Sequence, residues 1–293
     1  MSDRLFLRLP EDELHGPEAG PMPQASLQPV VLHAALRGHV ADMLLYHETV
    51  PRDAELIERV VPDGHLRLVF NFGDAPSTAE APGLVAGVIG PSAAPSLVRL
   101  RGRMHAFSLT LRPGAATALL GVPAGEFNGA AVPLDAIWGR EGADLQATLA
   151  DERSDAGRAR VLQRHLLRRV QGLRRESPAR QVDEALRLLA RTDAPTSMAD
   201  IAGRLGCGER RLQQLFHAHV GLPPRTWRRL LRLQVCLRRL REVEGGPPDW
   251  AGLAADCGFY DQPHLANEFR ALCGLSPTDY WCSTIAGSSK TPA

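Results

Sequence analysis

Two stretches of the 293-residue chain, IAGRLGCGERRLQQLFHAHVG at residues 201–221 and LAADCGFYDQPHLANEFRALCG at residues 253–274, repeat one pattern of small, apolar and glycine positions. The offset is 52 residues for the first three matched pairs and 53 for the others. Because the apolar positions recur while the polar positions differ, the pattern predicts one supersecondary unit used twice, with two binding surfaces of one kind. The matched pairs are Ala202 and Ala254, Leu205 and Cys257, Gly206 and Gly258, Leu212 and Leu265, Phe216 and Phe269, and Gly221 and Gly274.

Each unit is predicted to be two short helices around a glycine turn. In the first copy, Ser197 and Asp200 have the spacing of a capping box, and Gly206 ends the helix that they begin. In the second copy, Asp249 and Asp261 stand where helix N-caps are expected. Apolar residues at i, i+3 and i+4 face inward on both second helices. The outward polar positions are Arg210, Arg211, Gln213, Gln214 and His217 in the first copy, and Gln262, His264, Asn267, Glu268 and Arg270 in the second.

Charge is distributed unevenly along the chain. Residues 1–157 hold 12 Arg and 20 Asp plus Glu, whereas residues 158–293 hold 22 Arg plus Lys and 13 Asp plus Glu. Residues 158–241 alone hold 20 Arg and 6 acids, a charge pattern typical of a phosphate-binding surface. Between the units, Pro224 to about Val243 predicts one helix of roughly 18 residues, about 27 Å long. In a helix-turn-helix unit the second helix enters the major groove of DNA and is called the recognition helix. A connecting helix of this length could hold the second helices of the two units near one turn of DNA apart.

Residues 180–282 resemble the DNA-binding domain of the AraC/XylS family of transcription regulators. The resemblance rests on Ile201-Ala202 with Leu205-Gly206, on Gly221-Leu222-Pro223, and above all on the run from Gly258-Phe259-Tyr260-Asp261-Gln262 to Gly274-Leu275-Ser276-Pro277 and Tyr280. It implies two helix-turn-helix units joined by a long helix. It also implies base contacts by Arg210, Gln213 and Gln214 from the first unit and by Pro263, His264 and Asn267 from the second.

Two residues depart from the family pattern. The first recognition helix has Gly208 where a serine or threonine cap is usual, and glycine is a weaker cap. Pro263 has no backbone N–H to donate, so the second unit is expected to rely more on shape and phosphate contacts. The full set of predicted DNA contacts is Arg210, Arg211, Gln213, Gln214, His217, Gln262, Pro263, His264, Asn267 and Arg270.

The N-terminal half has a different pattern. Apolar residues alternate from His65 to Phe72, and short strand candidates follow at 85–89, 97–100 and 105–111. Helical segments are expected at 115–120, 134–138, 145–149 and 157–173. We therefore predict an α+β chain whose N-terminal domain is a small β barrel or sandwich with helices and whose C-terminal domain is all α-helical. The predicted limits are 1–172 for the N-terminal domain, 173–180 for a linker, 181–284 for the DNA-binding domain and 285–293 for a disordered tail.

The N-terminal half also resembles a domain that precedes this DNA-binding module in a subset of such regulators, on Val61-Pro62-Asp63-Gly64, Asn71-Phe72-Gly73-Asp74 and Leu111-Arg112-Pro113-Gly114 among other motifs. In the wider family such a half senses a small molecule or mediates dimerisation. Asp63 and Arg112 are the charged candidates for a ligand pocket, with a turn residue and a salt-bridge partner as the alternative interpretations.

Catalytic and metal motifs are not found. The GxSxG, GxxxxGKS and GxGxxG patterns are absent, and His39, His47, His65 and His105 lack HxH or HxxxH spacing, so no enzyme activity, metal or cofactor is predicted. All five cysteines lie in the C-terminal half and are expected to be thiols, three of them in the core. No signal peptide and no apolar run near 18 residues is present, so a cytoplasmic protein without a membrane span is expected.

The sequence therefore predicts a sequence-specific, DNA-binding transcription regulator of the AraC/XylS type. Double-stranded DNA is its expected partner, a small-molecule effector is expected at the N-terminal domain, and RNA polymerase and a second copy of the chain are further candidate partners. One alternative is a ligand-binding or enzymatic domain that a basic helical tail tethers to nucleic acid without sequence preference. Another is a purely helical interaction module that does not bind DNA.

Overall fold

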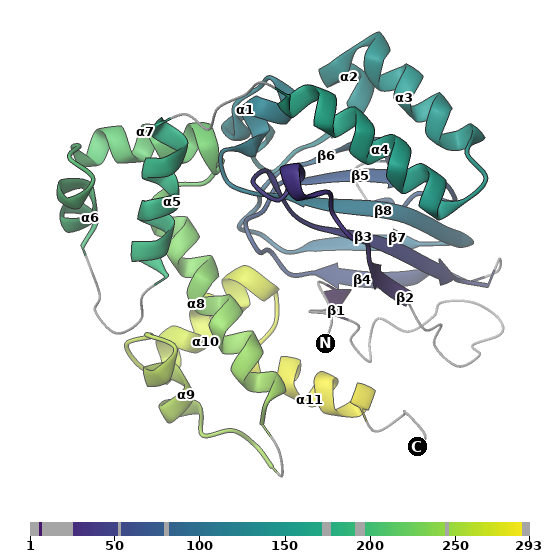
Figure 1. The fold of residues 1–293 in the computed structure, drawn as a ribbon. Helices are drawn as coiled ribbons and strands as arrows, with labels where there is room; N and C mark the ends of the chain where they lie inside the picture. The colour runs from purple at the N-terminus through teal and green to yellow at the C-terminus, as the bar shows by residue number, and fades with distance from the viewer. Residues whose placement is uncertain are drawn as a thin grey trace.

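The chain folds into an N-terminal domain of strands and helices and a C-terminal domain of helices only (Figure 1). The computed structural model describes residues 6–7, 26–51, 54–78, 82–171, 177–190, 197–243 and 246–288. Because the strands all belong to the first domain and the second is helical, the predicted α+β class is confirmed. The N-terminal residues, where the sequence predicts that there is no signal peptide, lie mostly outside the described residues.

Two antiparallel sheets form the centre of the N-terminal domain. Among the described residues, no edge strand of one sheet pairs with an edge strand of the other or of its own sheet, so neither sheet closes. Of the predicted barrel or sandwich, the barrel is therefore wrong. The larger sheet has the order β2 (Ser26–Pro29), β3 (Val40–Thr49), β8 (Arg103–Leu111), β5 (Arg67–Asn71), β6 (Ala86–Ile89) and β9 (Ala131–Pro133). The smaller sheet has the order β1 (Phe6–Leu7), β4 (Leu56–Val60) and β7 (Ser96–Leu100).

The two faces of the larger sheet bury different cores. Along β8, Phe107 and Leu109 belong to a core shared with the helices, whereas Met104 and Ala106 belong to a core shared with Leu56 of the smaller sheet. This division follows from the alternation of side chains along a strand. The domain therefore has three layers, with helices, the larger sheet and the smaller sheet in that order, which is the sandwich-like part of the prediction.

Helices cover one face of the larger sheet, as Figure 1 shows for α3 and α4. Ser154 caps α4, because its side-chain oxygen accepts a hydrogen bond from the N–H of Gly157. This cap fixes where α4 begins over the sheet. The helical segments of the domain are η1 (Ala34–Leu36), α1 (Ala115–Leu120), η2 (Ala124–Phe127), α2 (Leu134–Trp138), α3 (Arg140–Asp151) and α4 (Asp155–Val170).

One continuous hydrophobic core holds the C-terminal helices together, from Val182 of the first helix to Tyr280 of the last. It buries Cys236, Cys257 and Cys273, as the sequence predicted for three of the five thiols. The helices are α5 (Ser177–Leu189), α6 (Met198–Arg204), α7 (Glu209–His219), α8 (Pro224–Arg241), α9 (Trp250–Asp256), α10 (Gln262–Cys273) and α11 (Pro277–Ser288).

The ends of the C-terminal domain differ from the predicted limits. Helix α5 begins at Ser177, so residues 177–180 of the predicted linker are helical, and Pro178 is tolerated there because the first helical turn needs no N–H at that position. Residues 173–176 lie outside the described residues. Helix α11 continues to Ser288, so residues 285–288 of the predicted tail are helical here, and residues 289–293 are not described.

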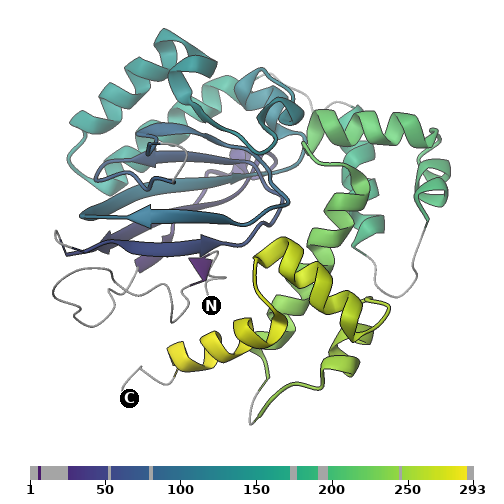
Figure 2. The ribbon, with the colours of Figure 1, turned by 180° about the vertical axis from the view of Figure 1, so that it is seen from behind.

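The two domains are in direct contact, and the views in Figures 1 and 2 agree on this. The side chain of Gln234 on α8 donates a hydrogen bond to the carbonyl of Pro62 at 3.0 Å, and the N–H of Gly114 donates to the carbonyl of His219 at 2.7 Å. Val61 of the N-terminal domain is part of the C-terminal core. None of the helices within the described ranges has both the length and the apolar character needed to cross a membrane.

Candidate DNA-binding surface

The first two-helix unit forms as the sequence predicted, from α6 and α7. The hydroxyl of Ser197 accepts a hydrogen bond from the N–H of Asp200 at 3.0 Å, and the carboxylate of Asp200 accepts one from the N–H of Ser197 at 3.2 Å. This capping box fixes the start of α6. Gly206 makes the turn with φ at +67°, a conformation that favours glycine. Gly208 is the N-cap of α7 and supplies no side-chain hydrogen bond.

Helix α7 presents a polar face to solvent. Leu212 and Phe216 are buried in the core, which turns the intervening polar residues outward. Arg210, Gln213 and Gln214 are exposed and make no hydrogen bond or ion pair with any described residue. These three side chains are therefore available to an external partner.

His217 lies at one end of this face, against the N-terminal domain. A Cβ atom added to Gly125 of η2 would stand 2.3 Å from Cε1 of His217, so the imidazole packs directly on the backbone of that glycine. The structure thus places His217 at the contact between the domains, although the sequence grouped it with the DNA contacts. Arg211 is exposed on α7, as Arg210 is.

The second unit, from α9 and α10, has a stronger cap. The carboxylate of Asp261 accepts a hydrogen bond from the N–H of His264 at 2.8 Å, and Pro263 lies in the first turn of α10 as predicted. His264 is half-buried, and its Nδ1 accepts a hydrogen bond from the N–H of Tyr260 at 3.2 Å. The exposed members of the predicted set on this helix are Gln262, Pro263, Asn267 and Arg270.

Helix α8 joins the two units and has the predicted length of 18 residues. Arg229 on α8 pairs with Glu268 on α10 at 2.7 Å, and Arg232 donates a hydrogen bond to the carbonyl of Gly258 at 3.1 Å. These contacts attach the second unit to the connecting helix. They also explain why Glu268, an outward position in the sequence pattern, is engaged within the domain.

The two charged ligand candidates of the N-terminal domain are both engaged. The carboxylate of Asp63 accepts hydrogen bonds from Arg67 Nη1 at 3.1 Å and from the N–H of His65 at 3.0 Å. Burial alone would raise the pKa of Asp63, but the charge of Arg67 and the hydrogen bonds hold that pKa well below its usual range. Arg112 donates from Nε to the carbonyl of Arg37 at 2.8 Å. Both side chains thus stabilise local structure.

A cavity of about 250 Å³ lies between the larger sheet and the helices. Its walls include the aromatic rings of Phe70 and Phe72 and the guanidinium of Arg158. Arg158 stacks over the ring of Phe72, with 4.6 Å between its Cζ and the ring centroid. The sequence did not group these residues as a pocket, because β5, α3 and α4 come together only in the folded domain.

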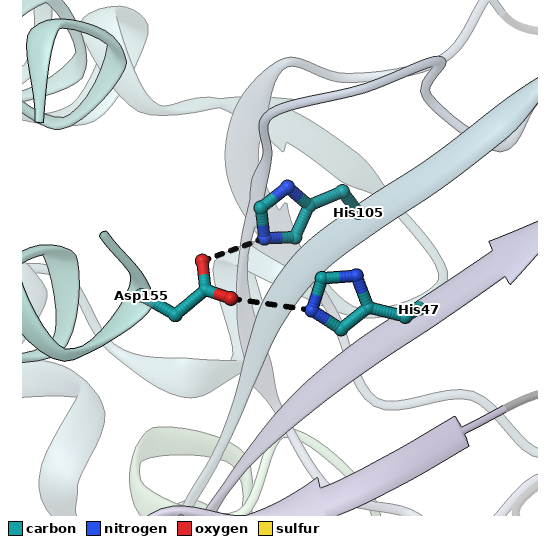
Figure 3. Close-up of side chains that lie close together, drawn as sticks. All are labelled: His47, His105 and Asp155. Carbon is teal, nitrogen blue, oxygen red and sulfur yellow. Dashed lines mark hydrogen bonds and ion pairs between the residues drawn. The ribbon is translucent and has the colours of Figure 1, made fainter. Parts of the chain in front are cut away.

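Two of the histidines that the sequence treated as scattered come together. His47 on β3 and His105 on β8 are direct partners in the antiparallel register, and their rings stack with centroids 4.2 Å apart. Asp155, the first residue of α4, points its carboxylate at both rings (Figure 3). Burial lowers the pKa of His105. Burial would raise the pKa of Asp155, but its hydrogen bonds with His105 and other neighbours lower it overall.

Two family models match the chain. Residues 201–281 match a helix-turn-helix domain, and residues 22–133 match a domain of unknown function. No curated protein sequence matches the chain.

Several solved structures of transcription regulators are similar to this chain. A regulator with an AraC-type DNA-binding domain from Chromobacterium violaceum is 25% identical, with 35% of this chain and 90% of that chain covered and a TM-score of 0.32. ToxT from Vibrio cholerae is 8% identical, with 90% and 99% covered and a TM-score of 0.41. The AraC-like transcriptional activator CuxR is 17% identical, with 79% and 86% covered and a TM-score of 0.33.

Proposed function

We propose that α7 and α10 each read base edges in the major groove. The premise is the AraC-type helix-turn-helix domain at residues 201–281, which marks this chain as a DNA-binding transcription regulator. The observation that carries this proposal is the set of exposed, unengaged polar side chains on α7. Arginine can pair with guanine, and glutamine or asparagine with adenine, through bidentate hydrogen bonds.

Within this proposal the two helices contribute unequally. On α7, Arg210, Gln213 and Gln214 make the base contacts, and Arg211 neutralises phosphate. On α10, Asn267 is the principal reader because it is exposed, His264 is half-buried and keeps only its Nε2 for a contact, and Pro263 offers no donor. Gln262 and Arg270 are exposed near the same surface and are assigned to phosphate or water-mediated contacts.

The test is a selection of random duplex DNA by the full-length protein and by two variants, Arg210→Ala and Asn267→Ala. We expect the wild type to enrich a site with two blocks about one helical turn apart, and each variant to relax one block. Each lost base contact should weaken binding to the selected site by about 1–3 kcal/mol.

The matched control is Arg140→Ala, which removes an arginine with a side chain 93% exposed on α3, away from both recognition helices. It should leave the enriched site unchanged. Salt-sensitive binding without enrichment of any sequence would contradict base readout and favour the alternative of a basic domain that tethers the chain to nucleic acid non-specifically. Failure to bind DNA at all would favour a helical interaction module.

The N-terminal domain is proposed to bind a small, mostly apolar effector in the cavity beside Phe70 and Phe72. The cavity volume of about 250 Å³ is slightly below the usual range for ligand pockets, so a compact molecule fits best. Native mass spectrometry of the purified protein should detect a bound small molecule that Ala150→Trp, at the cavity wall, displaces. Ala147→Trp on the same helix is the control, and retention of the ligand by both variants would refute this placement.

A further inference from the structure

The cluster of His47, His105 and Asp155 has the composition of a metal site. Each residue offers one donor atom, and the three atoms lie within 4.8 Å of one another. Two imidazole nitrogens and a carboxylate oxygen form a donor set that suits Zn²⁺ and neighbouring divalent transition metals. The DNA-binding function makes no use of these residues, which lie on the face of the larger sheet that α4 covers.

One pair of donor atoms has the spacing of a tetrahedral metal site. With metal bonds of about 2.0–2.1 Å, tetrahedral donor atoms are about 3.3 Å apart. The distance from His47 Nε2 to Asp155 Oδ2 is 3.3 Å. The distance from His105 Nε2 to Asp155 Oδ1 is 2.7 Å, the length of a hydrogen bond, so this hydrogen bond must break before His105 Nε2 can bind an ion together with Oδ2.

We propose that His47, His105 and Asp155 bind one divalent transition-metal ion of the Zn²⁺ type, with the fourth position open to water or to an exogenous donor. The open position follows from exposure, since the side chains of His47 and Asp155 are 40% and 32% exposed whereas that of His105 is 13% exposed. An ion can therefore enter from the solvent side, with His105 as the inner ligand.

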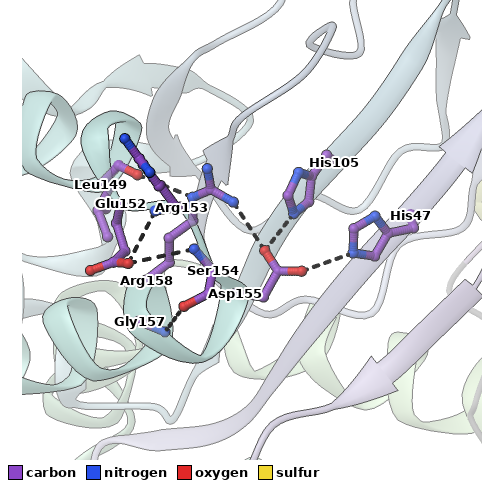
Figure 4. Close-up of polar contacts among 9 residues, drawn as sticks. All are labelled: His47, His105, Leu149, Glu152, Arg153, Ser154, Asp155, Gly157 and Arg158. Atoms are coloured by element: carbon purple, nitrogen blue, oxygen red, sulfur yellow. Dashed lines mark hydrogen bonds and ion pairs between the residues drawn. The ribbon is translucent and has the colours of Figure 1, made fainter.

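The backbone holds the three ligands independently of any ion. His47 and His105 are opposite each other on paired strands, so the sheet fixes the separation of their Cα atoms. Asp155 is fixed by the start of α4, where the Ser154 side chain caps the helix (Figure 4). A site with preset ligand positions requires little ordering of the chain when the ion binds.

Arg158 fixes the orientation of the carboxylate. Its Nη1 donates to Asp155 Oδ1 at 3.1 Å, and its Nε donates to the carbonyl of Leu149 at 3.1 Å (Figure 4). A carboxylate has about four lone-pair sites, so Oδ2 remains free to bind an ion while Oδ1 accepts from Arg158. Hydrogen bonds of this kind to a ligating group orient it and adjust metal affinity. The nearby positive charge opposes a cation and predicts moderate affinity.

The alternative is that the cluster only crosslinks β3, β8 and α4 by hydrogen bonds. To decide, the full-length protein, free of any affinity tag, is titrated with Co²⁺, whose visible absorption reports its coordination, and with Zn²⁺ in competition. We expect one Co²⁺ per chain, displaced by Zn²⁺. His47→Gln and Asp155→Asn should each weaken binding about tenfold or more.

The matched control is His33→Gln, which removes an exposed imidazole outside the cluster and should leave both affinity and spectrum unchanged. Thermal unfolding without metal establishes that the variants fold. Added Zn²⁺ should then raise Tm for the wild type and His33→Gln but not for the two cluster variants. No binding by the wild type, or equal binding by the cluster variants, would overturn the proposal. The assay uses no DNA, so its outcome is independent of the proposed regulator function.

Discussion

At the scale of single residues, Asp63 is a largely buried charge whose loss should lower stability. Its carboxylate pairs with Arg67, and both side chains are largely buried. We predict that Asp63→Asn lowers the free energy of unfolding at pH 7 by about 3 kcal/mol, because removal of one partner leaves the other charge buried and unpaired. Urea unfolding of the full-length protein measures the difference.

The same pair gives a pH dependence of known sign. The pKa of Asp63 is lowered in the folded protein, so its contribution to stability is complete above the unfolded pKa of about 3.9 and is lost as pH falls toward the folded value. The difference between wild type and Asp63→Asn should therefore shrink as pH falls below about 4. Asp144→Asn, which breaks an exposed pair with Arg140, is the control and should change stability little at any pH. An undiminished difference at low pH would contradict this assignment.

At the scale of helices and strands, α7 and α10, the helices proposed to read DNA, begin with different caps. We predict that Asp261→Ala lowers the free energy of unfolding by about 1 kcal/mol, since the N–H of His264 loses its acceptor. Gly208 is the N-cap of α7, as Asp261 is of α10. Gly208→Ala therefore changes the N-cap residue to alanine without removing a side-chain hydrogen bond. Thermal or urea unfolding compares the two.

The rescue of Asp261→Ala by Asp261→Ser completes this comparison. Serine is nearly as good an N-cap as aspartate, so Asp261→Ser should retain most of the stability. Equal losses in Asp261→Ala and Asp261→Ser would show that the carboxylate acts through another contact.

The units of the C-terminal domain could be predicted from the sequence because their signals are local. Capping residues, glycine turns and apolar spacing all lie within one helix or turn, and α6, α7, α9 and α10 form where these signals place them. The central strand β3 was missed. Leu45 and Tyr46 are both buried, in cores on opposite faces of the sheet, so β3 lacks the alternation that identifies a half-exposed strand.

The pairing of His47 with His105 was missed for a related reason. The spacing rules applied to the sequence detect ligands that lie close together along one segment. These two residues are opposite each other only because β3 and β8 pair in one register, and Asp155 joins them only because α4 crosses that sheet. If β3 had been predicted correctly, its pairing with β8 would have placed His47 opposite His105.

At the scale of the whole molecule, Gly64 is a point of close contact between the domains. A Cβ atom there would lie 2.8 Å from the Trp227 ring and 2.9 Å from Leu230, both on α8. We predict that Gly64→Ala destabilises the protein by about 1–3 kcal/mol more than backbone strain alone would, because the contact with α8 must open. Urea unfolding measures this, and small-angle scattering reports any separation of the domains.

Gly129→Ala separates the two causes. Gly129 has φ at +68°, close to the +77° of Gly64, but a Cβ there meets nothing within 4 Å. Both variants pay the left-handed backbone cost of about 1–2 kcal/mol, and only Gly64→Ala adds the contact with α8. Equal destabilisation by the two variants would mean that opening the contact between Gly64 and α8 does not lower the free energy of unfolding.

The continuous core from α5 to α11 has a consequence for how the protein searches a genome. A flexible pair of readers could accept two short words at many separations, and such combinations are common in any long sequence. The proposed readers α7 and α10 share this core with α8, so under the proposal they accept one separation and one rotational phase, and their two blocks act as a single long site. Long sites are rare among the competing sites, so the proposal implies that the rigidity of this core contributes to selectivity without touching a base.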